Sequence, residues 1–338
     1  MRNRAIRKIS LFLLFLTAIT VVTIAACNSN RSLLEKGQIS SATMPIDKSE
    51  IATAPVETKV ANHAFGQIEI PVHPQRVIVL DESMLLDSAL ALGIKPVGFA
   101  PCSNCLESHS GIPSELVADI SSVGDMNQPS LEKILYLKPD LILSYEWQRQ
   151  IYPQLSAIAP TVAIEPASGV GFKKEIAYIA HVLGRSDRVE EVLAKYEDRI
   201  KQLRHHLQTK LGTKKVATVH LYGSQISVWK PDLNTYSQIM SDAGLQFIQA
   251  QKDQQEDWLN ISIEFLPKYD ADFLFIVIVY EKDSENLNSL SFLKQPLWST
   301  LKAAQNKQIY AVQWAGIGGS IGANRVIDDL YKYLVKAS

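Results

Sequence analysis

The stretch from Asp187 to Leu211 restricts the fold more than any other part of this sequence. Its apolar residues recur at helical intervals, which places them on one face of a helix. These residues are Val189, Val192, Leu193, Tyr196, Ile200, Leu203, Leu207 and Leu211. Asp187 and Glu190 have the spacing of a capping box, and Gly212 follows as a stop signal. The pattern predicts an uninterrupted helix of roughly 37 Å, long enough to join two lobes.

The length and composition fit a globular protein with two domains. The chain has 338 residues, and a domain usually takes about 100–200 residues. Its apolar content of 46% and charged content of 20% are ordinary globular values. The formal net charge is −1 and no run of Lys or Arg occurs, so we expect no nucleic acid as a partner.

The N-terminus predicts export. Basic residues precede an apolar run from Ile9 to Ile24, which is short for a membrane span and suits a signal peptide. Ala25, Ala26 and Cys27 resemble a bacterial lipobox. That resemblance implies a signal peptide over residues 1–26, cleavage before Cys27 and a lipid on its thiol. The alternatives are an uncleaved anchor, or a plain signal peptide with an incidental cysteine. We expect a protein lipid-anchored in the periplasm or on the outer face of the cell membrane.

Two predicted lobes follow a tether. Residues 27–60 hold many Ser, Thr, Asn and Lys residues and few aromatics, which is typical of a flexible tether. Beyond them, buried-strand patterns alternate with helical patterns, which predicts βαβ units and parallel sheets. The fold class is therefore α/β, with two Rossmann-like lobes, central mostly parallel sheets and one long linking helix. We assign 61–184 to the N-terminal lobe, 185–212 to the linking helix and 213–338 to the C-terminal lobe.

The predicted strands and helices can be listed by residue range. The strands are 76–80, 95–99, 140–143, 161–164, 215–222, 225–229, 272–280 and 309–312. The helices besides the long one are 83–92, 130–137, 172–183, 235–243 and 321–335.

A short repeat connects the two lobes. Ser130-Leu-Glu132 stands ten residues before one buried strand, and Ser262-Ile-Glu264 stands ten residues before another. Each glutamate is expected in the first turn of a helix, where a carboxylate complements the helix dipole by about 0.3–1 kcal/mol. The alternative is that the two carboxylates, one per lobe, mark a docking surface for a basic partner.

No catalytic constellation is present in the sequence. It lacks G-x-S-x-G, H-E-x-x-H and a phosphate-binding Gly loop. No His, Asp and Glu cluster has metal-ligand spacing. His205 and His206 fall on the wet face of the long helix, and His220 falls within a strand as a satisfied core residue. We therefore expect neither an enzyme nor a protein that holds a metal directly.

Cys102 and Cys105 form a C-x-x-C pair in a loop after a predicted strand. In an exported protein a disulfide is the default state of such a pair. A redox dithiol, and metal binding together with His109, remain the alternatives.

Aromatic residues recur at the ends of predicted strands. They are Tyr145, Trp147, Tyr222, Trp229 and Trp314. Ligands of parallel sheets bind beyond the carboxyl ends of the strands, so these residues predict an aromatic ligand cleft. Arg149 or Lys230 could supply positive charge there, which suits a large, partly anionic small molecule.

Four stretches resemble the periplasmic substrate-binding proteins of ABC importers for iron–siderophores, ferric citrate, haem and cobalamin. They are RVIVLDESMLLDSALALGIKPVGFA, VGDMNQPSLEKILYLKPDLILS, IYPQLSAIAPTVAI and QPLWSTLKAAQNKQIYAVQWAGIGGSIGANRVIDDLYKYL. Together they make the resemblance specific, and it extends from His63 to the C-terminus.

The resemblance implies a ferric siderophore held between two lobes, with its iron bound by the chelator and no cofactor. Haem or cobalamin is the alternative ligand. It also implies that Glu132 and Glu264 dock on an ABC permease that works with an ATPase, and that Trp314 lies in the pocket. We expect a monomer. A thiol-redox surface lipoprotein that uses Cys102 and Cys105 is the alternative from a different class.

Overall fold

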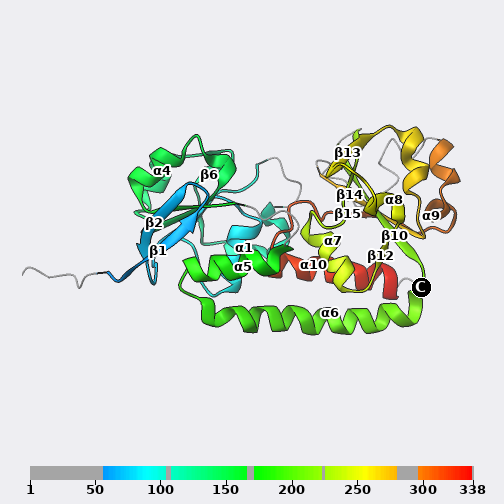
Figure 1. Ribbon diagram of the computed structural model, residues 1–338, viewed down its shortest axis with the longest axis horizontal. Coiled ribbons are helices and arrows are strands. Elements are labelled where there is room, and N and C mark those ends of the chain that lie inside the picture. Colours follow the sequence, from blue (N-terminus) through cyan, green and yellow to red (C-terminus); the bar gives the residue numbers. More distant parts are fainter. Residues whose placement is uncertain (1–55, 104–107, 166–170, 223–224, 280–295, 337–338) are drawn as a thin grey trace, which may run out of the picture. The chain divides into compact units, whose positions relative to one another are not determined.

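Two large β-sheets organise the part of the chain that the computed structural model describes (Figure 1). The described residues are 56–103, 108–165, 171–222, 225–279 and 296–336. The predicted signal peptide, Cys27, most of the predicted tether and Cys105 lie outside these ranges. The chain from Thr53 to Ser338 forms one unit.

The N-terminal lobe holds a five-stranded sheet whose order is β5-β4-β3-β8-β9, with every pair parallel. Its strands are β3 Val77–Val79, β4 Gly98–Phe99, β5 Ser121–Ser122, β8 Leu141–Tyr145 and β9 Thr161–Ile164. Its helices are α1 Met84–Ala91, α2 Ser114–Val117, α3 Leu131–Tyr136, α4 Tyr152–Ile158 and α5 Gly171–Val182. Every residue of β3, β8 and β9 is buried, as expected for parallel strands covered on both faces.

An antiparallel hairpin precedes this sheet and was not predicted. It consists of β1 Thr58–His63 and β2 Gly66–Pro71. The backbone N–H of Ala64 donates a hydrogen bond to the carbonyl of Ala163 at 2.9 Å, which fastens the hairpin turn to β9. The tether boundary at residue 60 was therefore wrong, because residues 58–60 already pair within the hairpin.

The C-terminal lobe holds a six-stranded sheet that is mostly parallel. Its order is β13-β11-β10-β14-β15, and β12 also pairs with β10. The strands are β10 Lys215–Tyr222, β11 Gln225–Trp229, β12 Gln246–Phe247, β13 Trp258–Ile261, β14 Phe273–Ile278 and β15 Ile309–Val312. The helices are α7 Thr235–Asp242, α8 Gln249–Lys252, η4 Ile263–Tyr269, η7 Pro296–Thr300, α9 Lys302–Gln305 and α10 Ser320–Leu330, which continues as a π-helical turn over Tyr331–Lys336. Among these described strands the antiparallel pairs are β10–β11 and β11–β13, and the other pairs are parallel.

The long helix α6 spans Val189–Leu211 without interruption (Figure 1). It buries the predicted face. Its buried residues are Val192, Tyr196, Ile200, Leu203 and Leu207. The predicted capping box is absent. Arg188 occupies the N-cap position without a side-chain cap, and Asp187 lies in a preceding 3₁₀ turn. Among the described residues, no helix combines the length and the apolarity that crossing a membrane requires.

One apolar core joins the helices of both lobes. Buried residues of α1, α5, α6, α7 and α10 belong to a single cluster, together with one face of each large sheet. Asp87 of α1 accepts hydrogen bonds from the backbone N–H groups of Ile321 and Gly322 in α10, at 3.0 and 2.7 Å. The first turn of α10 therefore takes its cap from a helix of the other lobe.

The predicted repeat is visible as matching hydrogen bonds in the two sheets. Before β8, the N–H of Asp140 donates to the carbonyl of Arg76 and its carboxylate accepts from the N–H of Arg76. Before β14, the N–H of Asp272 donates to the carbonyl of Lys215 and its carboxylate accepts from the N–H of Lys215. In each lobe, an aspartate thus fixes the register of two central parallel strands.

Candidate functional site

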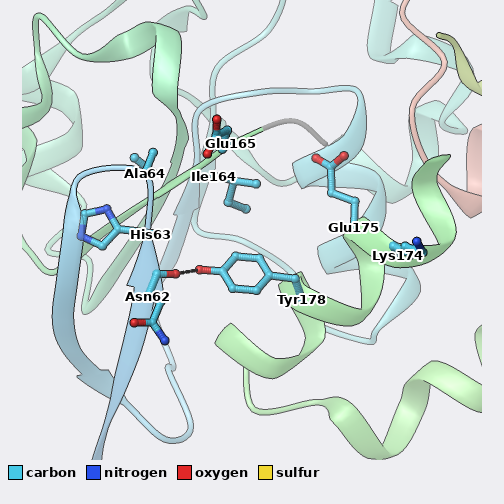
Figure 2. A pocket seen from close by; sticks show the side chains of 9 residues that line it. Asn62, His63, Ala64, Ile164, Glu165, Lys174, Glu175 and Tyr178 are labelled. Atoms are coloured by element: carbon cyan, nitrogen blue, oxygen red, sulfur yellow. Dashed lines mark hydrogen bonds between the residues drawn. The ribbon is translucent and has the colours of Figure 1, made fainter. Parts of the chain in front are cut away.

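A pocket of about 450 Å³ opens beside the carboxyl end of β9. The end of β1, the residue after β9 and helix α5 supply its polar side chains, which are Asn62, His63, Glu165, Lys174, Glu175 and Tyr178. Figure 2 shows Glu175 and Tyr178 on α5, with the Tyr178 hydroxyl donating to the carbonyl of Asn62. The pocket lies where the parallel arrangement of the strands predicts a ligand site.

Tyr145 and Trp147 form a stacked pair at the carboxyl end of β8. Their ring centroids are 4.1 Å apart with an interplanar angle of 17°. The Tyr145 hydroxyl donates to Glu175 Oε1 at 2.7 Å, which connects the pair to the pocket wall. Burial raises the pKa of Glu175. Tyr145 is buried whereas Trp147 is 48% exposed, so Trp147 offers the open ring surface and Tyr145 holds it in place.

Arg149 lies against the hairpin turn instead of in this pocket. Its guanidinium carbon is 4.3 Å from the centre of the Phe65 ring, a distance typical of a cation–π contact. Phe65 in turn packs edge-on against Tyr152, with 4.6 Å between the ring centroids. The predicted positive charge is therefore near the strand ends but is held by an aromatic partner.

Tyr222 and Trp229 both lie against the His220 ring, with ring centroids 6.2 and 5.3 Å from the centroid of His220. Tyr222 ends β10 at the carboxyl edge of the parallel strands. Strand β11 runs antiparallel to β10 and Ser227 pairs with His220, so Trp229 lies beside the middle of β10, on the other side of His220 from Tyr222. Trp229 stacks on Trp258, with 6.1 Å between the ring centroids. The half-exposed Trp258 was not predicted, because β13 has no apolar run that marks it as a strand.

Lys230, the other predicted source of positive charge, already has oxygen partners. Its ammonium donates to the carbonyl of Gln255 at 2.9 Å and lies 3.5 Å from the carboxylate of Asp257.

The prediction of His220 as a satisfied core residue is largely correct. Its Nε2 is 2.6 Å from the Tyr236 hydroxyl, and burial lowers its pKa to about 3. The other ring nitrogen, Nδ1, has no hydrogen-bond partner among the described residues.

Trp314 is a core residue, which corrects its predicted place in the pocket. Its side chain is 0% exposed. Its ring stacks on that of Phe275, with 5.1 Å between the ring centroids. Its indole Nε1 donates to Asp329 Oδ2 at 2.9 Å. A strand-end position alone does not reveal whether a side chain turns into the layer of helices, and here the buried carboxylate holds the indole inside.

Glu132 and Glu264 are both exposed near the start of short helices. Ser130 caps α3 as predicted, because its hydroxyl accepts from the N–H of Lys133 at 3.3 Å. Glu264 begins a 3₁₀ helix in which Ser262 makes no such cap. A hydrogen bond from the Ser262 side chain lowers the pKa of Glu264, so this carboxylate is charged at neutral pH.

Cys102 is disulfide-bonded. Cys105, its predicted partner, lies outside the described residues, so this pairing stays a prediction. A disulfide state disfavours metal binding by Cys102, since a metal ligand must be a free thiolate. Within the described ranges, no three His, Cys, Asp or Glu side chains gather as a metal site.

A buried carboxyl group that the sequence analysis missed follows β3. Glu82 is 1% exposed and lies 3.6 Å from Nδ1 of His109. Burial raises its pKa to about 7, although backbone hydrogen bonds from Cys102 and His109 oppose this rise. The only signal in the sequence was the acidic pair of Asp81 and Glu82 shortly after a buried strand.

Comparisons with known proteins agree on one family. The profile described as periplasmic binding protein matches residues 78–313. A probable siderophore-binding lipoprotein of Bacillus subtilis, YfiY, is 30% identical, covering 98% of this chain and 99% of that protein. The achromobactin-binding periplasmic protein of Dickeya dadantii is 32% identical over 76% of this chain and 85% of its own length.

A solved structure shows the same fold. Staphylococcus aureus SirA complexed with staphyloferrin B matches with a TM-score of 0.69 and 26% identity. The match covers 82% of this chain and 98% of that chain.

Proposed function

This chain belongs to the periplasmic binding protein family, and we propose that it captures a ferric siderophore and delivers it to an ABC permease. It is an exported protein with two α/β lobes joined by α6. The observation that carries the proposal is the pocket at the carboxyl end of β9, next to the Tyr145–Trp147 stack. This site occurs in a chain that matches a probable siderophore-binding lipoprotein along its whole length.

Trp147 and Tyr222 are the direct ligand contacts in this proposal. Both follow the carboxyl edge of a parallel sheet, one in each lobe. Tyr145 holds the Trp147 ring in place by stacking against it. Arg149 supplies positive charge to the ligand once its guanidinium has moved away from the Phe65 ring. Trp229 contributes through its contact with His220, and Trp314 acts only as a core support. The ligand brings its own iron, so the protein needs no cofactor.

A fluorescence screen tests the ligand class. The purified protein is titrated with ferric hydroxamate, catecholate and citrate chelates, and separately with haem and cobalamin. We expect tryptophan quenching by at least one ferric chelate and its loss in Trp147→Ala. Quenching by haem or cobalamin alone would show that the ligand is not a ferric siderophore. Quenching by none of the compounds would contradict the proposed function.

We propose that a lipid on Cys27 anchors a monomer to the membrane. The lipobox-like residues before Cys27 and the lipoprotein relatives support this. Cys27→Ser should release the protein from the membrane fraction without changing ligand affinity. Retention of the variant in that fraction would argue for an uncleaved anchor.

We also propose that Glu132 and Glu264 dock on basic residues of the permease, which works with an ATPase. Both carboxylates are exposed, and both stand at matching points of the two lobes. Glu132→Ala combined with Glu264→Ala should abolish ligand uptake while ligand affinity is kept. Normal uptake by the double variant would leave both glutamates with a role at the helix dipole alone.

A further inference from the structure

Large apolar side chains stand exposed beside both glutamates. Four large apolar side chains of the described residues are at least 60% exposed, and one of them, Val56, lies at the start of the described chain. The other three are Tyr136 at 83%, Phe265 at 63% and Leu135 at 60%. Leu135 and Tyr136 lie in α3 with Glu132, and Phe265 adjoins Glu264 in η4.

The geometry of α3 places its carboxylate and its apolar side chains together. Glu132, Leu135 and Tyr136 are three and four positions apart, so they share one face of the helix. The opposite face is held down by Ile134, which is 0% exposed.

The corresponding segment of the C-terminal lobe repeats this division. Leu266 is 1% exposed and fastens η4 to the core, whereas Glu264 and Phe265 face solvent. Each lobe thus presents one carboxylate with aromatic surface beside it.

We propose that Leu135, Tyr136 and Phe265 are apolar anchors that bury themselves in the permease when Glu132 and Glu264 dock. This inference rests on the proposed function. Aromatic residues dominate the binding energy of protein interfaces when they are fully desolvated. Charged residues in such interfaces give specificity and raise the association rate more than they raise affinity. The anchors would therefore supply affinity, and the glutamates would supply orientation.

One carboxylate in each lobe favours a partner protein with two basic residues over a second copy of this chain. Lys133 and Lys268 are exposed in the same two segments, so an anionic lipid surface is an outcome that the test has to decide. A second copy of this chain, docking the same surface on itself, would bring like charges together. A permease with basic residues opposite the glutamates accommodates both kinds of side chain.

The test measures how tightly the full chain binds its permease–ATPase complex in nanodiscs. The chain is first loaded with the ferric chelate that quenches its tryptophan fluorescence. Tyr136→Ser with Phe265→Ser should weaken the affinity at least about tenfold, and should do so equally at low and high salt. Glu132→Ala with Glu264→Ala should instead slow association and reduce its salt dependence. Leu116→Ser is the matched control, because Leu116 is also exposed, at 40%, but lies in α2.

Each outcome decides the inference separately from the proposed function. The ferric chelate must quench the tryptophan fluorescence of the Tyr136→Ser, Phe265→Ser variant as strongly as that of the parent. Equal quenching shows that the ligand site of the variant is folded. Unchanged permease affinity in that variant would overturn the inference while leaving the proposed function intact. Binding of the non-lipidated chain to phosphatidylglycerol vesicles, or a dimer that these substitutions dissociate, would also overturn it. Tyr136→Phe should retain the parent affinity, because the ring and not the hydroxyl is the anchor.

Discussion

At the residue scale, Trp314 and Trp147 have the same ring and opposite roles. Trp314 is enclosed between Phe275 and Tyr236, and its indole N–H is satisfied by Asp329. Trp147 rests on Tyr145 with half of its surface in solvent. Loss of the first should therefore affect folding, and loss of the second should affect binding.

Trp314→Phe should lower the free energy of unfolding by about 1–3 kcal/mol, because Asp329 loses a buried hydrogen-bond donor. Chemical denaturation in urea measures this loss. Ligand affinity should change less than about twofold, since the ring has no exposed surface. Trp147→Phe is the control, with a stability change within about 0.5 kcal/mol. A large loss of ligand affinity in Trp314→Phe without a change in stability would show that Trp314 contacts the ligand.

Glu82 should make the protein less stable as the pH rises. Its pKa is raised from 4.5 to about 7 in the folded protein, so the folded state holds the proton more tightly than the unfolded state does. This contribution is present at low pH and is lost as the pH rises from about 4.5 to about 7. Asp87, whose pKa burial also raises to about 7, acts in the same direction.

Glu82→Gln should therefore reduce the loss of stability between about pH 5 and about pH 7.5 by roughly 1–3 kcal/mol. The measurement is urea denaturation of parent and variant at several pH values. Comparing the two proteins cancels the contributions of Asp87 and of the other titrating groups. Parallel pH profiles would mean that Glu82 titrates at its ordinary pKa.

At the element scale, the contact between α1 and the start of α10 depends on two glycines. A Cβ at Gly319 would lie 2.1 Å from Asp87 Oδ1, and a Cβ at Gly318 would lie 2.7 Å from the backbone nitrogen of Met84. Only a residue without a side chain lets the carboxylate of Asp87 reach the N–H groups of Ile321 and Gly322.

Gly319→Ala should reduce the free energy of unfolding by about 2–4 kcal/mol, because the methyl group displaces the carboxylate that caps α10. Ser320→Ala, one residue further on, should change stability by less than about 1 kcal/mol. Thermal and urea denaturation of both variants provide the comparison. Equal stability of the two variants would show that the cap adjusts without loss.

The sequence predicted elements where one periodicity dominates. The ranges predicted for β9, β10, β11 and β15 match the structure, because each is a short apolar run between turn residues. The hairpin of β1 and β2 was missed because its exposed faces are polar and resemble a tether. The direction of β11 was also missed, since periodicity records which residues face the core and not which way a strand runs.

At the scale of the whole molecule, the lobes share apolar contacts as well as α6. Helices from both lobes belong to one core cluster, and Arg199 of α6 forms an ion pair with Asp328 of α10 at 2.6 Å. Relative motion of the lobes would have to open packed surface, which disfavours wide closure.

We expect ligand binding to change the radius of gyration by less than about 1 Å, as small sliding of packed helices permits. Small-angle X-ray scattering of the free and the chelate-loaded protein measures this change. The permease would then meet Glu132 and Glu264 at a nearly fixed separation. A contraction of more than about 2 Å on loading would instead indicate a true hinge.

The cap between Asp87 and α10 also sets the order in which this exported chain can fold. Helix α1 lies near the start of the folded part, whereas α10, which packs in the same core cluster, lies near the C-terminal end of the described chain. The N-terminal lobe therefore cannot complete its core until almost the entire chain has been delivered. A chain that ends before Ser320 should lose hydrogen-exchange protection in α1 as well as in the C-terminal lobe.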